Sequence, residues 1–87
     1  MKSKATGARL RAKKPNPQDP RLLFGKRVRQ QRIERGLSQE RLAELSNLHR
    51  NYIGGIERGE RNVGLLNVVE LAHTLRVRPM NLLDLIA

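Results

Sequence analysis

The sequence predicts an all-α bundle of five short helices. Apolar residues recur three and four positions apart between glycine, serine and proline punctuation, and strand-like alternation is absent. The chain has 87 residues and no cysteine, so we expect one small domain without disulfides or thiolate metal sites. The expected helices span about residues 20–35, 39–45, 49–58, 65–75 and 80–86.

The first two expected helices have clear boundary signals. Asp19 followed by Pro20 is typical of an N-cap with proline at the first helical position. Gly36 suits the left-handed backbone that ends a helix, and Ser38 is expected to cap the next one. Within that second helix, the residues expected to face the core are Leu42, Ala43 and Leu45.

The C-terminal third contains more large apolar residues than a small core needs. The fourth helix carries the expected core stripe Leu65, Val68, Ala72 and Leu75, and Pro79 opens the last helix. Five further apolar residues are divided between core and surface: Leu66, Leu82, Leu83, Leu85 and Ile86. Those left exposed predict an apolar strip suited to a two-fold contact, and hence a homodimer.

Positive charge is concentrated at the N-terminus. The formal net charge is +10, and seven of the 18 basic residues lie within the first 21 positions, against one acidic residue. Residues 1–19 are therefore expected to form a flexible basic arm, with the folded domain over residues 20–87. Lys13 and Lys14 allow two interpretations: a disordered tail, or an arm that follows DNA phosphates or enters a minor groove.

Composition excludes several function classes. No apolar run is long enough to cross a bilayer, and the basic N-terminus lacks the apolar segment of a secretion signal, which predicts a cytoplasmic protein. The small size argues against an enzyme, and His49 and His73 lack companions at metal-ligand spacing, so neither a metal nor a cofactor is expected. The only aromatic residues, Phe24 and Tyr52, are too few for single-strand stacking surfaces, which favours duplex DNA as partner.

Residues 38–59 have the spacing of a helix-turn-helix. Ala43 is small enough for a close crossing of two helices, and Asn47 tolerates the positive φ of the sharp turn between them. The face of the second of these helices that is expected to be exposed carries His49, Arg50, Asn51, Tyr52, Gly54 and Gly55. Arginine pairs with guanine edges and asparagine with adenine edges in the major groove. The two glycines cost helix stability, so we expect them to permit a close approach to a base or to DNA backbone.

Three sequence blocks carry a family resemblance: residues 38–43 (SQERLA), 48–53 (LHRNYI) and 56–62 (IERGERN), followed by Leu71, Ala72, Leu75 and Val77. Over about residues 22–85 the chain resembles the phage-repressor (Cro/cI-like, or XRE) helix-turn-helix family. The resemblance implies a lambda-repressor-like DNA-binding fold, a recognition helix at about residues 49–58 and a sequence-specific transcriptional regulator of double-stranded DNA, encoded by a bacterium or phage and associated with the nucleoid.

The resemblance also implies roles for individual residues. His49, Arg50, Asn51 and Gly54 match base-facing positions. Gln39, Tyr52 and Asn62 match contacts to the DNA backbone, and Arg32 with Glu57 matches a structural ion pair. Other functions of the same fold stay open: an antitoxin that represses its own operon and binds a toxin, a restriction-modification controller, and a basic adaptor for RNA or protein.

Overall fold

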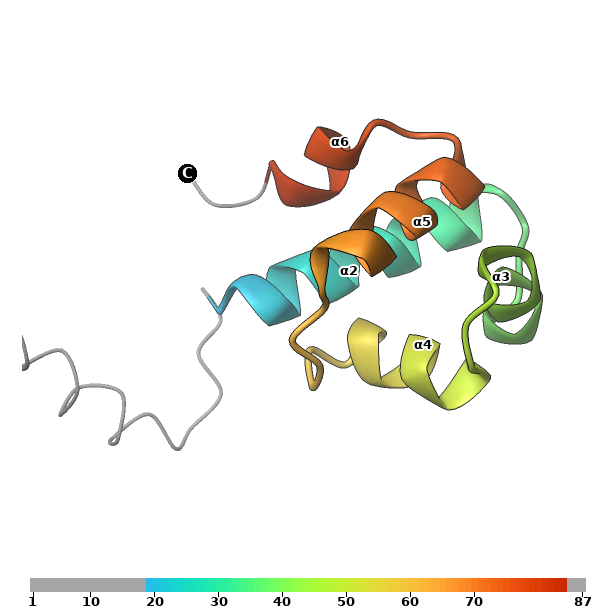
Figure 1. The fold of residues 1–87 in the computed structure, drawn as a ribbon, viewed down its shortest axis with the longest axis horizontal. Helices are drawn as coiled ribbons and strands as arrows, with labels where there is room; N and C mark the ends of the chain where they lie inside the picture. Colours follow the sequence, from blue (N-terminus) through green and yellow to red (C-terminus); the bar gives the residue numbers. More distant parts are fainter. Residues whose placement is uncertain (1–18, 85–87) are drawn as a thin grey trace, which may run out of the picture.

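The computed structural model describes residues 19–84, which contain five helices and no strand (Figure 1). The helices are α2 (Pro20–Glu34), α3 (Gln39–Ser46), α4 (Arg50–Glu57), α5 (Leu65–Leu75) and α6 (Pro79–Leu83). The predicted all-α class is therefore confirmed. The predicted arm, with Lys13 and Lys14, lies outside the described residues except for Asp19, and so do Leu85 and Ile86.

The predicted signals set the ends of α2 and α3. The Asp19 carboxylate accepts a hydrogen bond from the Arg21 backbone N–H at 2.9 Å, directly before Pro20. The side chain of Ser38 caps α3 by accepting from the Arg41 backbone N–H at 2.9 Å. Gly36 has φ +66° where α2 has ended, a backbone conformation that glycine adopts without steric cost.

The turn between α3 and α4 confirms one prediction and corrects another. Asn47 is left-handed, with φ 58° and ψ 41°, as the sharp turn requires. The prediction that Leu45 faces the core is wrong, because its side chain is exposed and Ser46 is buried instead. At about 100° per residue, Leu42, Ala43 and Ser46 share one face of α3, and Leu45 points well away from it.

The last two helices differ from the prediction at their ends. Leu65 is exposed rather than buried, and Leu71 takes its place in the core stripe. Side chains lean toward the N-terminus of their helix, so the side chain of this first residue of α5 projects past the packed face. α6 ends at Leu83 instead of Ile86, with Asp84 as its C-cap, while Leu82 is fully buried.

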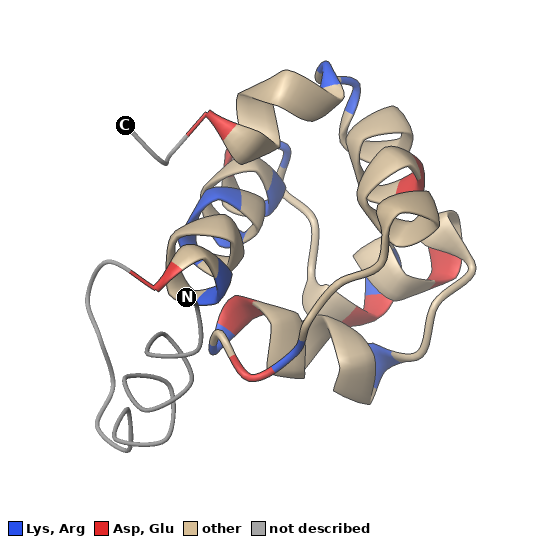
Figure 2. Ribbon diagram, turned by 60° about the vertical axis from the view of Figure 1, so that its left-hand side comes forward, with Lys and Arg blue, Asp and Glu red and all other residues tan. Residues whose placement is uncertain are grey.

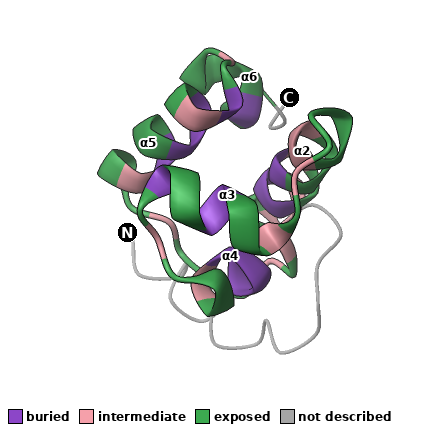
Figure 3. Ribbon diagram, turned by 90° about the vertical axis from the view of Figure 1, so that its right-hand side faces the viewer, coloured by how far each residue is buried: buried purple, intermediate pink, exposed green. Residues whose placement is uncertain are grey.

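The core lies where the inner faces of all five helices meet (Figure 3). Its members are Phe24, Val28, Leu42, Ala43, Ile53, Ile56, Val68, Leu71, Ala72, Leu75 and Leu82. α2 is the central element, since it packs against α4, α5 and α6, and α3 packs against α4 and α5. This arrangement holds α4 at the edge of the molecule, with one face in the core and the opposite face outward.

Two further properties concern only residues 19–84. None of their helices is long and apolar enough to span a membrane. Nor does this part of the chain bring together three or more His, Asp or Glu side chains that could hold a metal ion.

Candidate nucleic-acid interface

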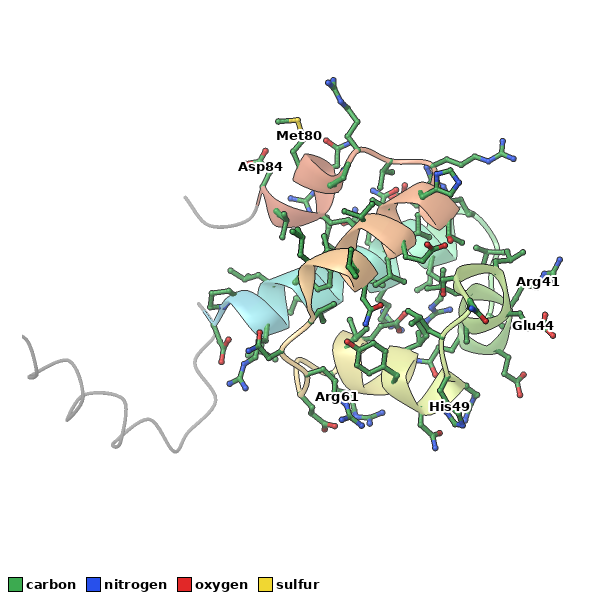
Figure 4. All side chains as sticks on the ribbon, in the orientation of Figure 1. Arg41, Glu44, His49, Arg61, Met80 and Asp84 are labelled. Carbon is green, nitrogen blue, oxygen red and sulfur yellow. The ribbon has the colours of Figure 1, made fainter. Side chains whose placement is uncertain are left out.

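The candidate interface is the outer face of α4. Ile53 and Ile56 anchor the helix in the core, whereas Arg50 and Asn51 are exposed in its first turn. In Figure 4 the labelled side chains of His49 and Arg61 lie near the two ends of α4, on the same edge of the molecule. A helix seated in this way presents its N-terminal residues to an external partner while its inner face stays packed.

His49 is the N-cap of α4 rather than its first helical residue, which corrects the predicted helix of residues 49–58. Its Nδ1 accepts a hydrogen bond from the backbone N–H of Asn51 at 3.0 Å. An accepting Nδ1 requires a neutral imidazole with its proton on Nε2. His49 therefore stabilises the start of α4 and keeps an outward N–H donor on its exposed side chain.

Replacing His49 with aspartate is expected to separate fold stability from DNA affinity. Aspartate is a stronger N-cap and interacts favourably with the helix dipole, so the free energy of unfolding should rise by about 0.5–1 kcal/mol. The added negative charge should weaken binding to duplex DNA. Urea denaturation and a DNA titration at fixed salt measure the two effects. His49→Asn is the uncharged control: it should keep the cap, and an equal loss of affinity in both variants would contradict a charge effect.

Gly54 and Gly55 are buried, so the prediction that they are exposed is wrong. Two arginine side chains cover them. A Cβ built on Gly54 would lie 3.1 Å from Nη1 of Arg58, and one built on Gly55 would lie 2.9 Å from Nε of Arg61. The close approach that the glycines permit in the free protein is thus to its own basic side chains.

The loop after α4 alternates basic and acidic residues (Figure 2). Arg58 and Glu60 form an exposed two-point ion pair, with Nε–Oε2 at 3.0 Å and Nη2–Oε1 at 3.1 Å. Hydrogen bonding from Arg58 lowers the pKa of the Glu60 carboxyl below its ordinary value of 4.5, so Glu60 is ionised at neutral pH. The guanidinium of Arg61 lies over the Tyr52 ring, 5.7 Å from its centroid, in cation–π geometry.

A half-buried polar cluster fixes α4 relative to α2 and α3. Arg32 donates to both carboxylate oxygens of Glu57, at 2.7 and 3.0 Å, and to the Leu37 carbonyl oxygen at 2.8 Å. The Gln39 side-chain amide donates to Glu57 Oε1 at 3.1 Å. The structure therefore places the expected Arg32–Glu57 pair in contact and adds Gln39 to it. Gln39 begins α3, so this cluster sets the position of one of the predicted DNA-backbone contacts relative to α4.

Two other described residues are predicted to contact the DNA backbone, Tyr52 within α4 and Asn62 in the loop that follows it. Tyr52 is half-buried, and its hydroxyl accepts a hydrogen bond from the side-chain amide of Asn67 in α5 at 3.2 Å. Asn62 is exposed and borders an apolar pocket that also includes Phe24 and Leu83. Tyr52 is thus tied to α5 at its hydroxyl, whereas Asn62 sits in the loop between α4 and α5.

Sequence reasoning missed Arg58 and Arg61. A side chain near the end of a helix covers the turn that precedes it, so an arginine four residues after Gly54 is expected to lie on that glycine. The spacing of Gly54 and Arg58 was therefore an available signal. The position of Arg61 over Gly55 depends on the path of the loop, which no local pattern predicts.

The short α3–turn–α4 unit, its left-handed Asn47 and the outward face of α4 define a helix-turn-helix DNA-binding protein. Residues 28–82 match the family model described as helix-turn-helix. The chain belongs to this helix-turn-helix family.

Proteins similar to this chain include controller proteins and a master regulator. The chain is 52% identical over 65 residues to the control protein C.BamHI of Bacillus amyloliquefaciens, which covers 74% of this chain and 80% of that protein. The restriction-modification controller protein C.AhdI from Aeromonas hydrophila superposes with a TM-score of 0.70 at 52% identity, over 71% of this chain and 94% of that one. SinR, a master regulator for biofilm formation solved in complex with DNA, gives a TM-score of 0.68 at 32% identity, over 70% and 98% of the two chains.

Proposed function

We propose that the protein is a sequence-specific, double-stranded DNA-binding transcriptional regulator that acts as a restriction-modification controller. The observation that carries the proposal is the outer face of α4, where Arg50 and Asn51 are exposed at the helix N-terminus while Ile53 and Ile56 hold the opposite face in the core. A helix presented in this way fits the major groove of duplex DNA.

The residues divide into base-reading and backbone-contacting groups. Arg50 matches a guanine edge and Asn51 an adenine edge, and His49 offers the Nε2 proton left free by its cap. Gly54 remains a predicted base-facing position, but it has no side chain and is buried beneath the side chain of Arg58. Backbone contacts are proposed for Gln39 of α3, Tyr52 of α4 itself and Asn62 of the following loop. Lys13 and Lys14 are proposed to make such contacts from the N-terminal arm.

The controller assignment rests on similarity to C.BamHI and C.AhdI, each 52% identical to this chain. An antitoxin paired with a toxin, and an adaptor for RNA or protein, are not favoured by any observation on the described residues. Selection of bound duplexes from a randomised pool, at fixed near-physiological salt, tests the proposal. Enrichment of a defined operator is the expected result, and a pool without enrichment would contradict sequence-specific regulation.

Arg50→Ala is expected to weaken binding to the selected operator by about 1–3 kcal/mol and to relax the preference at one base pair. The reason is loss of a two-point contact from a guanidinium to a base edge. Competition titrations against operators changed at single positions measure the effect. Arg76→Ala is a charge-matched control, because Arg76 is exposed at the far end of α5. A loss that is uniform across all operators would make Arg50 a phosphate contact instead.

We further propose that the protein binds DNA as a homodimer through α5 and α6. The large exposed apolar residues on these two helices are Leu65, Leu66, Val69, Met80 and Leu83. Leu66 is 83% exposed, an unfavourable position for a leucine in a monomer. Self-association would remove this apolar surface from water and would place two copies of α4 about one DNA turn, ~34 Å, apart on a palindromic site.

Leu66→Glu is expected to shift the protein from dimer to monomer without unfolding it. A carboxylate in the apolar contact would lose hydration without gaining a partner. Sedimentation equilibrium over a range of protein concentrations measures the change. Leu45→Glu is the matched control, because Leu45 is also exposed but lies on α3. Equal self-association of the wild type and Leu66→Glu would place the contact elsewhere.

A further inference from the structure

The guanidinium of Arg58 occupies the place that a side chain at position 54 would fill. Its Nη1 lies 3.1 Å from the Cβ position of Gly54, and Oε1 of Gln39 lies 3.8 Å from the same point. Any larger residue at position 54 would meet the guanidinium, so the glycine creates the space for it. Arg58 is the C-cap of α4, and its side chain therefore reaches back over the middle of the helix.

Glu60 holds this guanidinium from one side. The carboxylate accepts from Nε and Nη2, the two donors along one edge of the planar group. Both side chains are exposed, at 62% and 57%, so neither is held by core packing. Among residues 19–84, the end of the guanidinium, with both Nη1 hydrogens and one Nη2 hydrogen, has no carboxylate partner.

We propose that Arg58 reads a guanine in the operator, with Glu60 as its positioning residue, and so supplies the base contact that Gly54 cannot make through a side chain. The inference rests on the proposed DNA-binding function of α4. The end-on pair of N–H donors matches the O6 and N7 acceptors of guanine, which arginine contacts more often than any other base edge. Glu60 limits the rotation of the long side chain, which lowers the entropic cost of that contact.

The carboxylate also distinguishes a guanine from a phosphate as the target. The Glu60 carboxylate offsets the positive charge of Arg58 and repels a nearby phosphate, so the attraction of the pair to DNA phosphates is weakened. A guanine edge is neutral and depends on the direction of the donors, which the two-point pair fixes. The Arg58–Glu60 pair therefore disfavours phosphate contacts, which every duplex offers, and favours contact with a guanine.

The first test compares Arg58→Ala with the wild type on the operator selected by the wild type. We expect the preference for guanine at one base pair to fall by at least about tenfold. That base pair should differ from the one that Arg50→Ala affects. Circular dichroism controls for folding, which should be unchanged because Arg58 is exposed.

The second test is Glu60→Gln. The loss of charge and the loss of positioning are expected to change DNA binding in opposite directions. Removal of the negative charge should raise affinity for unrelated duplexes, whereas loss of the two-point grip should reduce the preference at the Arg58 base pair by several-fold. Glu34→Gln is the charge-matched control, since Glu34 is exposed at the end of α2. It should leave the preference at that base pair unchanged.

The outcomes separate this inference from the proposed function. If the wild type selects an operator but Arg58→Ala lowers affinity equally for every sequence, Arg58 is a phosphate contact and the proposal is overturned. If Glu60→Gln leaves the guanine preference unchanged while Arg58→Ala lowers it at one base pair, Glu60 does not position Arg58. A wild type that selects no operator would instead reject the proposed function itself.

Discussion

Replacing Gly25 with alanine is expected to destabilise the domain by about 3 kcal/mol or more. A Cβ at this position would overlap the backbone carbonyl oxygen of Ile56 and would lie 2.9 Å from that of Glu57. Neither atom belongs to a flexible side chain, so the added methyl group can be accommodated only if α2 and α4 move apart. A small domain has only about 5–15 kcal/mol of stability in total, and the midpoint of urea denaturation measures the loss.

Helix propensity alone predicts that Gly25→Ala would stabilise the domain. Alanine within a helix is favoured over glycine by about 1 kcal/mol, so a domain in which α2 and α4 had room between them would be stabilised. Gly64→Ala is the matched control, because nothing lies within 4 Å of its Cβ position and its φ is −71°. Gly64 is the N-cap of α5, where alanine is less favourable than glycine, so this change should cost no more than about 1 kcal/mol. Equal stability of Gly25→Ala and the wild type would contradict the close helix contact.

Glu57→Gln is expected to cost about 3 kcal/mol or more in free energy of unfolding. The side chains of Arg32 and Glu57 are only 12% and 3% exposed, so the substitution leaves a guanidinium charge in the interior with no countercharge. The amide also keeps only one of the two acceptor oxygens, so its NH2 group faces a donor of Arg32 or Gln39 in place of the other oxygen. Chemical denaturation measures the stability, and operator titration measures the accompanying loss of DNA affinity.

An exposed ion pair provides the comparison for Glu57. Arg41 and Glu44 pair at 2.8 Å on α3, with side chains 57% and 68% exposed, and both are labelled in Figure 4. Water already solvates these charges, so Glu44→Gln should cost less than about 1 kcal/mol. A similar cost for both substitutions would mean that burial does not determine the strength of the Arg32–Glu57 pair.

Local signals in the sequence were sufficient for the fold class and most helix ends. Proline, serine, asparagine and glycine act through the backbone within one or two residues, which is why the predictions at Ser38, Gly36 and Asn47 agree with the structure. Burial depends on neighbours that are distant in sequence. The exposure of Leu45 and Leu65 therefore escaped prediction, although both occur in apolar patterns with helical spacing.

Some features of the candidate site could likewise be predicted from the sequence, whereas others could not. The outward positions of Arg50 and Asn51 follow from helix periodicity and the identity of the buried residues, and both could be predicted. The capping role of His49 was missed because histidine is not among the usual N-cap residues. The covering of Gly54 and Gly55 was missed because it depends on side chains from beyond the end of α4.

The link between Gln39 and Glu57 holds α3 and α4 at a fixed separation within the DNA-binding unit. One hydrogen bond of 3.1 Å joins the first residue of α3 to the last residue of α4. If Gln39 contacts a phosphate as proposed, α4 therefore has little freedom to slide along the groove. For the proposed homodimer, we expect the bundle itself not to absorb a change of one base pair in the separation of the half-sites. Tolerance to such a change would then depend on bending of the DNA or on the proposed contact between protomers.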